Sequence, residues 1–497
     1  MPALVPLLFS AIVYRPILDN YFYTDDFGHL YNLANNGVGE FLLTPHGGHL
    51  LFVRNLIFCA FYKLFGLDPF PYLLSVFVTH LANVCLLYLV IVRLTQSVRL
   101  AIFGATLWGV CPLDEGSLGW YSVYGHVLAG TIFLWVLCDV LGVTRHRQVP
   151  SGWRLAGWWL LLIAGATCFG VGLAVAMTFP AVVFLLLPAS PARARTVRAT
   201  LALVIVIPIL FVTLHRVYLA ISGGAADASV VPYLQLFNWQ FTGEMLVQLL
   251  RYGAGCLALP YVAGGTSDPC VLCGWVGTLC LAGIALVLLR APVLHKRRLL
   301  AFVLTAVATY ALIAAGRATF YLAFGKSVVL AATESRYHYV GLLSIAIVFC
   351  LLLNDLGRVA PLGAWRGNVL LVGWLGAVVF CFVRYHQPID AHAAARQETQ
   401  SVLATIDKLA KATRDRQPLY IHNYVFRSIG WSPAHNFPGW AGVFLIAYPE
   451  RLVNGLPVYF VETDPDILAA ARSRPDRPIN TILLSPGQVQ ALSSPGS

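Results

Sequence analysis

Residues 72–92 read YLLSVFVTHLANVCLLYLVIV, a mostly apolar stretch that contains no Asp, Glu, Lys or Arg. A helix needs about 20 apolar residues to cross the roughly 30 Å hydrocarbon layer of a bilayer, so this run is long enough. The whole chain has the same character, because 58% of its residues are hydrophobic, 11% are charged and its mean hydropathy is +0.74. This composition excludes a soluble globular protein and predicts an integral membrane protein whose spans are helices.

Similar apolar runs recur up to residue 384, and we expect about eleven transmembrane helices. Their approximate positions are 1–18, 72–92, 100–112, 123–143, 155–169, 171–188, 199–221, 271–289, 299–322, 338–354 and 368–384. The first run is interpreted as a span because it lacks the basic region and the small-residue cleavage site of a signal peptide. The expected fold class is an all-α polytopic membrane protein with its transmembrane domain over residues 1–384.

The loops between these spans alternate in charge. Alternate loops carry fourteen Lys and Arg residues and one acid, Asp355, whereas the other loops carry carboxylates. By the positive-inside rule, the arginine-rich loops and the N-terminus face the cytoplasm and the acidic loops face outward. Because this topology accounts for the formal net charge of +11, we expect membrane lipids and no nucleic acid as partners.

Two apolar stretches are not counted as spans. Residues 49–66 carry Arg54 and Lys63 and are interpreted as a juxtamembrane amphipathic helix within a first outward loop over 19–71. Residues 244–263 would invert the charge pattern if they crossed the membrane. We therefore interpret 222–270 as a long outward loop with a helix lying at the membrane interface.

The composition changes after residue 384, where charged residues become frequent. Residues 385–497 combine a helix-like pattern at 397–413 with strand-like runs at 418–426, 456–462 and 480–485. We expect a small external α/β domain of about 110 residues, large enough for its own core. The sequence of this domain contains no catalytic constellation, which favours a lid or an acceptor-docking module.

Two pairs of acidic residues lie in the first two outward loops. YFYTDDFGHLY (21–31) places Asp25 and Asp26 side by side, and CPLDEGSLGWYSVYGH (111–126) carries Asp114 and Glu115. Asp25 and Asp26 either end a solvated loop, cap a helix or belong to an active site. Because topology puts both pairs in water on the same face, we expect them to converge over one external cavity.

A third outward segment, TESRYHY (333–339), follows Arg317 and Lys326. It brings Glu334, Arg336 and His338 to the mouth of the tenth span. Arg317, Lys326, Arg336 and Tyr337 are candidate binding residues. The planar guanidinium group of Arg336 suits phosphate oxygens. The alternatives for this residue are a lipid-headgroup anchor and an ion pair with Glu334.

Aromatic residues and histidines complete the candidate site. Trp120 and Tyr124 either line a sugar pocket or belong to the aromatic belt at the membrane surface. The remaining candidate binding residues are His49, Arg54, Asp114 and His126. Carboxylates and histidines of these loops could bind a divalent metal, but no fixed-spacing metal motif is present, so we expect no obligatory cofactor.

The eleven cysteines lie mostly inside apolar runs, where cysteine behaves as a small hydrophobic residue. Cys270 and Cys273, in the sequence CVLC, have the one spacing that suggests a disulfide or a metal site.

Four segments resemble successive landmarks of the GT-C superfamily of polytopic glycosyltransferases. They are 20–33 (NYFYTDDFGHLYNL), 49–90, 111–129 (CPLDEGSLGWYSVYGHVLA) and 334–341 (ESRYHYVG). The enzymes of this superfamily use polyprenyl-phosphate-linked sugars, and the likeness is strongest to protein O-mannosyltransferase-like members. The resemblance implies a first outward loop built from juxtamembrane helices.

The resemblance also implies roles for individual residues. Asp25 would be the general base for the acceptor hydroxyl, with Asp26 in a supporting or helix-capping role. Glu115 falls where such families carry an acid in the second outward loop, and Arg336 falls in an Arg-Tyr motif near the lipid phosphate.

Three features depart from the family pattern. Tyr124 and His126 stand where related chains often have an Arg and an Asp, and residues 168–170 (CFG) stand where a Lys-Glu pair is common. A tetratricopeptide tail, which the related mannosyltransferase-like chains carry, is absent. These departures leave the donor sugar and the acceptor open.

The sequence therefore predicts a glycosyltransferase, hexosyl or pentosyl, that moves a sugar from a polyprenyl-phosphate donor to a hydroxyl of a protein, lipid or glycan. We expect inversion at the anomeric carbon, on the periplasmic face of a bacterial inner (plasma) membrane. The alternative is a polytopic transporter or a lipid-linked-sugar flippase. Transporters tend to carry charges near the midplane and repeated halves, which this sequence lacks.

Overall fold

The computed structural model describes most of the chain up to residue 359 and short pieces beyond it. The described ranges are 2–22, 25–26, 29–30, 33, 37–46, 49–66, 68–146, 148–221, 238–258, 269–290, 292–323, 325, 327–359, 367–368, 372–373, 375–376, 379 and five strands after residue 418. The chain forms two compact units. The first unit comprises Met1–Leu18, Leu42–Ala60 and Pro71–Gln387. The second unit comprises Asp19–Phe41, Phe61–Phe70 and Pro388–Ser497. Each unit is described by itself.

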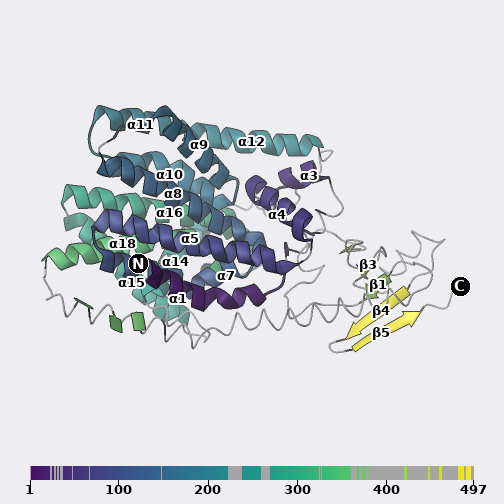
Figure 1. Ribbon diagram of the computed structural model, residues 1–497. Helices are drawn as coiled ribbons and strands as arrows, with labels where there is room; N and C mark the ends of the chain where they lie inside the picture. Colours follow the sequence, from purple (N-terminus) through teal and green to yellow (C-terminus); the bar gives the residue numbers. More distant parts are fainter. Residues whose placement is uncertain are drawn as a thin grey trace. The chain divides into compact units, whose positions relative to one another are not determined.

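The first unit is a bundle of α-helices (Figure 1). Its longer helices are α5 (Pro69–Thr95), α8 (Tyr124–Arg145), α10 (Gly170–Leu186), α12 (Leu203–Ile221), α14 (Trp239–Ala258), α15 (Pro269–Arg290), α16 (Val293–Ala323) and α18 (Tyr339–Val359). Shorter helices are α1 (Leu4–Tyr14), α4 (Phe52–Phe65), α6 (Val98–Gly109), α7 (Glu115–Leu118), α9 (Gly152–Ala166), α11 (Pro191–Leu201) and α17 (Val328–Ala332). Among the described helices, α6, α9, α11 and α17 each follow a serine whose hydroxyl accepts a hydrogen bond from a backbone N–H of the first turn.

Each predicted span before residue 355 coincides with a helix. Within the described residues, five helical stretches are long and apolar enough to cross a membrane, namely Pro69–Thr95, Tyr121–Arg145, Arg193–Ala220, Val271–Arg290 and Val293–Leu322. The apolar helices Val98–Gly109, Gly170–Leu186 and Tyr339–Asp355 are shorter. The prediction of a mostly helical protein with apolar spans is therefore confirmed for the described part. The count of eleven stays a prediction, since 368–384 lies largely outside the described residues.

One end of the bundle, here called the arginine end, is tied together by loop arginines. Arg297 at the start of α16 donates to the carbonyl oxygens of Phe184 and Leu187, at 2.6 and 2.9 Å, where α10 ends. Arg298 donates to the carbonyl oxygen of Leu94 at 3.4 Å, where α5 ends. These arginines satisfy carbonyl groups that a helix leaves free at its last turn.

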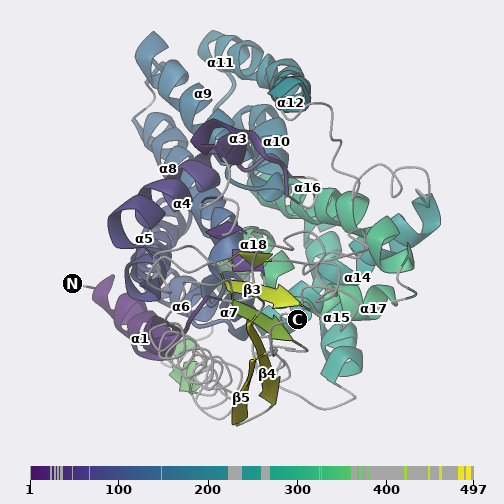
Figure 2. The ribbon, with the colours of Figure 1, turned by 90° about the vertical axis from the view of Figure 1, so that its right-hand side faces the viewer.

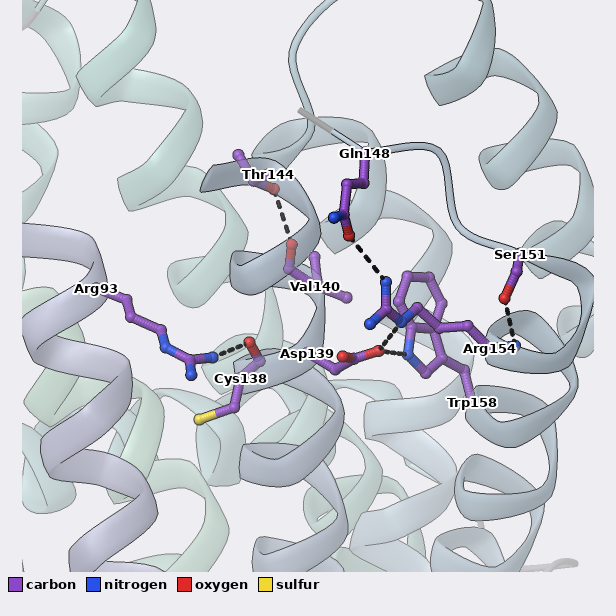
Figure 3. Close-up of polar contacts among 9 residues, drawn as sticks. All are labelled: Arg93, Cys138, Asp139, Val140, Thr144, Gln148, Ser151, Arg154 and Trp158. Carbon is purple, nitrogen blue, oxygen red and sulfur yellow. Dashed lines mark hydrogen bonds and ion pairs between the residues drawn. The ribbon is translucent and has the colours of Figure 1, made fainter. Parts of the chain in front are cut away.

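Helices α8 and α9 are joined near the same end through Asp139 (Figure 3). One oxygen of the Asp139 carboxylate accepts a hydrogen bond from Nε1 of Trp158 at 2.8 Å and forms an ion pair with Nε of Arg154 at 3.0 Å. Arg93 of α5 donates to the carbonyl oxygen of Cys138 on the neighbouring turn. The arginine-rich loops thus gather at one end, as their alternation along the sequence predicts.

The opposite end, here called the acidic end, contains the segments around residues 114–126 and 334–338. Helix α16 connects the two ends, because it has 31 residues and carries Arg297 near its start and Arg317 near its finish. At 1.5 Å per residue these two arginines lie about 30 Å apart along the axis, the thickness of a hydrocarbon layer. Which end faces outward stays a prediction.

Helix α14 runs antiparallel to α15 and packs along it (Figures 1 and 2). A Cβ atom added to Gly255 would lie 1.9 Å from the carbonyl oxygen of Cys273, and one added to Gly277 would lie 1.7 Å from that of Arg251. The backbones are therefore in direct contact, as in small-residue helix pairs of membranes. Nε of Arg251 on α14 donates to Thr278 Oγ1 on α15 at 2.8 Å. Among the described helices, α14 is not one of those long and apolar enough to cross a membrane, and its expected position at the membrane interface stays a prediction.

The predicted juxtamembrane helix over 49–66 is present as α4, with Lys63 exposed and Arg54 buried. Arg54 is 1% exposed and its guanidinium carbon lies 5.8 Å from the centre of the Phe58 ring. Sequence reasoning used Arg54 as a sign of interfacial position. The aromatic contact explains how the helix can bury it instead.

The second unit contains a five-stranded mixed sheet with the order β2-β3-β1-β4-β5. The strands are β1 (Leu419–His422), β2 (Ile446–Ala447), β3 (Val458–Val461), β4 (Asn480–Ser485) and β5 (Gln488–Ser493). β1 is parallel to both neighbours, and the outer strands are antiparallel. β1, β3 and β4 lie within the three predicted strand-like runs. The predicted helix over 397–413 lies outside the described residues, so the α/β domain and its boundaries stay a prediction.

Candidate functional site

Two arginines come together at the acidic end of the first unit. Arg317 comes from α16 and Arg336 from the 3-10 turn Ser335–Tyr337. Both guanidinium groups act electrostatically on the ring of His126 and on the hydroxyl of Tyr337. The structure therefore groups four of the sequence-predicted site residues from three distant parts of the chain.

Aromatic rings surround the guanidinium group of Arg336. Its central carbon lies 5.0 Å from the centre of the Trp120 ring and 5.3 Å from that of Tyr337. Glu334 forms an ion pair with Arg336 at 3.6 Å, but both side chains are about one third exposed, so the pair is weak. Trp120 thus offers a ring face to a cation, and this contact orients Arg336.

A glycine allows this turn to approach the second acidic loop. A Cβ atom added to Gly116 of α7 would lie 2.1 Å from Oγ of Ser335 and 2.8 Å from the backbone nitrogen of Arg336. The hydroxyl of Ser117 donates to the carbonyl oxygen of Arg336 at 3.3 Å. The position of Arg336 therefore depends on α7, which begins at Glu115.

Arg317 has a neutral partner. Its guanidinium group donates to Nε2 of His49 at 3.2 Å, which leaves the ring proton of His49 on Nδ1. Desolvation and the charge of Arg317 hold the pKa of His49 well below its usual value, so the ring is uncharged at neutral pH. Among the described residues Arg317 contacts no carboxylate, and Glu334 is the acid paired with Arg336. The two-arginine site is therefore positively charged.

Phe169 lies between two of the predicted histidines. The centre of its ring is 4.7 Å from that of His49 and 4.0 Å from that of His126. His126 is buried, and in the described part of the chain neither of its ring nitrogens has a hydrogen-bond partner. Sequence reasoning noted Phe169 as a departure from the family pattern and assigned it no role. A lone phenylalanine in an apolar chain gives no signal of such a contact.

Asp114 lies deeper in the bundle than the sequence predicts. Its side chain has no exposed surface, and its two oxygens have no hydrogen-bond partner among the described residues. Its electrostatic neighbours include the hydroxyls of Tyr14, Tyr310 and Tyr339. Burial raises the pKa of Asp114 well above its usual value. The expected water-facing position is wrong for Asp114, whereas its neighbour Glu115 is part-exposed.

Tyr124 packs between two helices, and Arg54 lies near His49. The Tyr124 hydroxyl bonds Oγ1 of Thr79 on α5 at 2.7 Å, and its ring stacks on Tyr121 at 5.3 Å. These contacts place Tyr124 in the packing between α5 and α8. Arg54 acts electrostatically on His49 from the buried side of α4.

Asp25 and Asp26 belong to the second unit. Both are helical, Asp25 is part-buried and Asp26 is buried. The burial of Asp26 differs from the water-exposed position predicted for the pair. Because the units are described separately, convergence of the two acidic pairs stays a prediction. Lys326 lies outside the described residues.

No group of three or more His, Cys, Asp or Glu side chains in the described part of the chain is arranged to hold a metal ion. The metal requirement remains a prediction.

Comparisons with known proteins give a distant structural likeness. No family model and no curated relative matches the chain. ArnT from Cupriavidus metallidurans bound to undecaprenyl phosphate is similar to it over 96% of this chain and 92% of that chain, at 15% identity and a TM-score of 0.48. The apo state of the same protein gives 14% identity and a TM-score of 0.44 over the same shares. Likenesses this distant assign no residue role, so the GT-C resemblance continues to rest on the sequence motifs.

Proposed function

We propose that the chain is a membrane glycosyltransferase that moves a sugar from a polyprenyl-phosphate-linked donor to a hydroxyl acceptor on the outer face of the membrane. The observation that carries this proposal is the pair of arginines, Arg317 and Arg336, at the acidic end of a bundle of apolar helices. A lipid-linked phosphate presents its charge where the helices leave the membrane. A positively charged site at that level suits such a ligand better than a soluble one.

The arginines would stabilise the leaving group. When the bond between the sugar and the phosphate breaks, negative charge builds up on the phosphate oxygens, and fixed cations nearby lower the barrier. Arg336 is held by Trp120 and by the backbone contact with α7, and Arg317 is held by His49. Groups fixed in this way need no rearrangement during the reaction.

The acceptor hydroxyl needs a base, and Asp25 is proposed for that role with Asp26 and Glu115 in support. An ordinary carboxylate suffices if it lies within hydrogen-bond reach of the hydroxyl. A single base opposite the leaving phosphate gives one displacement and inversion at the anomeric carbon. Asp25 is part-buried, whereas Asp26 is buried, so Asp25 is the better placed of the two for contact with an acceptor.

The test uses the purified protein in vesicles with a polyprenyl-phosphate sugar and measures release of the polyprenyl phosphate. Arg336→Gln and Arg317→Gln are each expected to lower the rate by about 100-fold, the size of a lost charge-stabilising contact. Arg195→Gln is the matched control, because Arg195 is exposed at the arginine end. Asp25→Asn should abolish transfer while the protein stays folded and inserted.

Three results would contradict the proposal. Full activity of Asp25→Asn would contradict the role of Asp25 as the base. Equal rates for the Arg336 and Arg195 variants would contradict the role of Arg336 in binding the phosphate. Movement of a labelled lipid-linked sugar across the vesicle membrane, unaffected by these variants, would instead support a flippase.

A further inference from the structure

We infer that Cys256 and Cys273 form a disulfide bond that joins α14 to α15. Their sulfur atoms lie 3.3 Å apart, closer than two sulfurs in ordinary contact, and both side chains are fully buried. The sulfur–sulfur bond of a disulfide is about 2.05 Å long, so the two sulfurs must approach each other further for the bond to form. This pairing differs from the CVLC spacing, in which Cys270 would be the partner of Cys273.

The two helices are held in the register that the bond requires. Gly255, next to Cys256, brings the α14 backbone against the Cys273 carbonyl group. One turn away, Nε of Arg251 donates to Oγ1 of Thr278 at 2.8 Å and to the carbonyl oxygen of Gly274 at 3.3 Å. These contacts fix both the distance and the rotation of the helix pair. Cys256 and Cys273 thus face each other as a consequence of the packing of the two helices beside them.

The position of the pair suits an oxidising compartment. Cys256 lies near the end of α14 and Cys273 near the start of α15, whereas Arg290 of the arginine end lies at the other end of α15. The charge pattern of the loops places Arg290 in the cytoplasm, so the cysteines lie in the outer half of the bundle. Disulfides form and persist on that side of a bacterial inner membrane.

The reaction is a thiol–disulfide exchange with an oxidised thiol oxidoreductase of the cell envelope. Each cysteine thiol gives up its hydrogen, a bond forms between the two sulfurs, and the disulfide of the oxidant is reduced to two thiols. Because both sulfurs are buried in the finished bundle, exchange takes place while α14 and α15 assemble.

The bond would stabilise one wall of the acidic end. Tyr252 of α14 packs against the ring of His338 with 5.6 Å between ring centres, and Gly253 lies beneath Tyr310 and His338. His338 follows the turn that carries Arg336, and its Nε2 donates a hydrogen bond to the carbonyl oxygen of Ala332 at 2.8 Å. Fixing α14 to α15 therefore supports the segment next to the two-arginine site.

The test maps the cysteines of the full chain as it is produced in bacterial membranes. Membranes are dissolved in denaturant with N-ethylmaleimide and no reductant, and the digested protein is analysed by mass spectrometry. We expect the peptides containing Cys256 and Cys273 as one linked species, two hydrogen atoms lighter than the separate thiol peptides. Reduction before alkylation should separate them. Cys280→Ser, a change on the same helix, should keep the link, and Cys256→Ser should leave Cys273 alkylated.

Thermal unfolding gives a second measurement. Reductant should lower the Tm of the wild type and of Cys280→Ser by several degrees and leave the Tm of Cys256→Ser unchanged. Maleimide on both Cys256 and Cys273 in the unreduced wild type would overturn the inference. A link between Cys270 and Cys273 would overturn it as well.

Discussion

The surroundings of the Asp114 carboxyl group determine its pKa and its access to solvent. It is fully buried near three tyrosine hydroxyls, and burial raises its pKa well above the usual value. Its neighbour Glu115 begins α7 and is part-exposed. Two adjacent acids thus have different chemistry, and Glu115 is the one that a substrate can reach.

The raised pKa predicts a pH-dependent stability. Between the ordinary pKa of about 4 and the raised one, the folded protein binds a proton at Asp114 that the unfolded chain has released, so stability falls as pH rises. The loss can reach about 1.4 kcal/mol per pH unit in that window. Asp114→Asn cannot release a proton, so its Tm should exceed that of the wild type increasingly from pH 5 to pH 7.5. Parallel Tm curves of the two proteins in detergent would contradict this prediction.

Residue types at the site could be predicted from the sequence, but their burial could not. Arg317, Arg336, His49 and His126 were named from loop chemistry and from the family resemblance, and the structure brings them together. The burial of Asp114 depends on helices that are hundreds of residues apart in the sequence, and no local pattern encodes that packing.

At the scale of elements, the contact between α7 and the Ser335–Tyr337 turn positions the candidate site. It depends on Gly116, because any side chain at that position meets Ser335 or the backbone of Arg336. The two segments lie about 220 residues apart in the sequence, and tight packing of this kind tolerates little added volume.

Gly116→Val should therefore disrupt the site. We expect a loss of about 1–3 kcal/mol in the free energy of unfolding, as for an overpacked core, and at least a tenfold lower transfer rate because Arg336 moves. Gly157→Ala is the matched control, since Gly157 of α9 has open space around it and alanine favours a helix. Measurements of Tm and of transfer rate check this, and unchanged values for Gly116→Val would refute it.

The hydrogen bond from Trp158 to Asp139, which joins α9 to α8, leads to a different prediction. Trp158→Phe removes the hydrogen bond to Asp139 (Figure 3). It keeps an aromatic ring at this position, which can still pack against Phe179. The expected loss is about 1 kcal/mol of stability with no change in transfer rate per folded molecule, because the contact lies at the arginine end. A transfer rate that fell as steeply as that of Gly116→Val would show that the two ends are coupled.

Helix positions could be predicted from the sequence because apolar runs of span length have few other interpretations. The partner of α14 could not be predicted in this way. The place of α14 along α15 depends on Gly255 and Gly277 and on the partner of Arg251. These are contacts between helices, which counting the charges of loops cannot reveal.

At the scale of the whole molecule, the first unit separates its charges into two ends about 30 Å apart along α16. At the arginine end, loop arginines donate hydrogen bonds to the last carbonyl groups of helices, and the candidate site lies at the acidic end. The alternation of loop charge predicted this separation, since a bundle of antiparallel spans puts alternate loops at the same end. The placement of the second unit is not encoded in any such pattern.

Labelling with a membrane-impermeant maleimide tests the orientation. In intact cells, with the outer membrane made permeable, Ser327→Cys should be labelled and Arg195→Cys should be labelled only after the inner membrane is opened. Both positions are exposed, and they lie in loops of opposite predicted side. The unmodified chain gives the background from its own cysteines. The reverse pattern would overturn the topology.

The contact at Gly116 has a mechanical consequence. Because α7 touches the backbone of Arg336 without an intervening side chain, we expect the two segments to move together. If Arg336 binds the phosphate of the proposed donor, a displacement of Arg336 would therefore also displace Glu115.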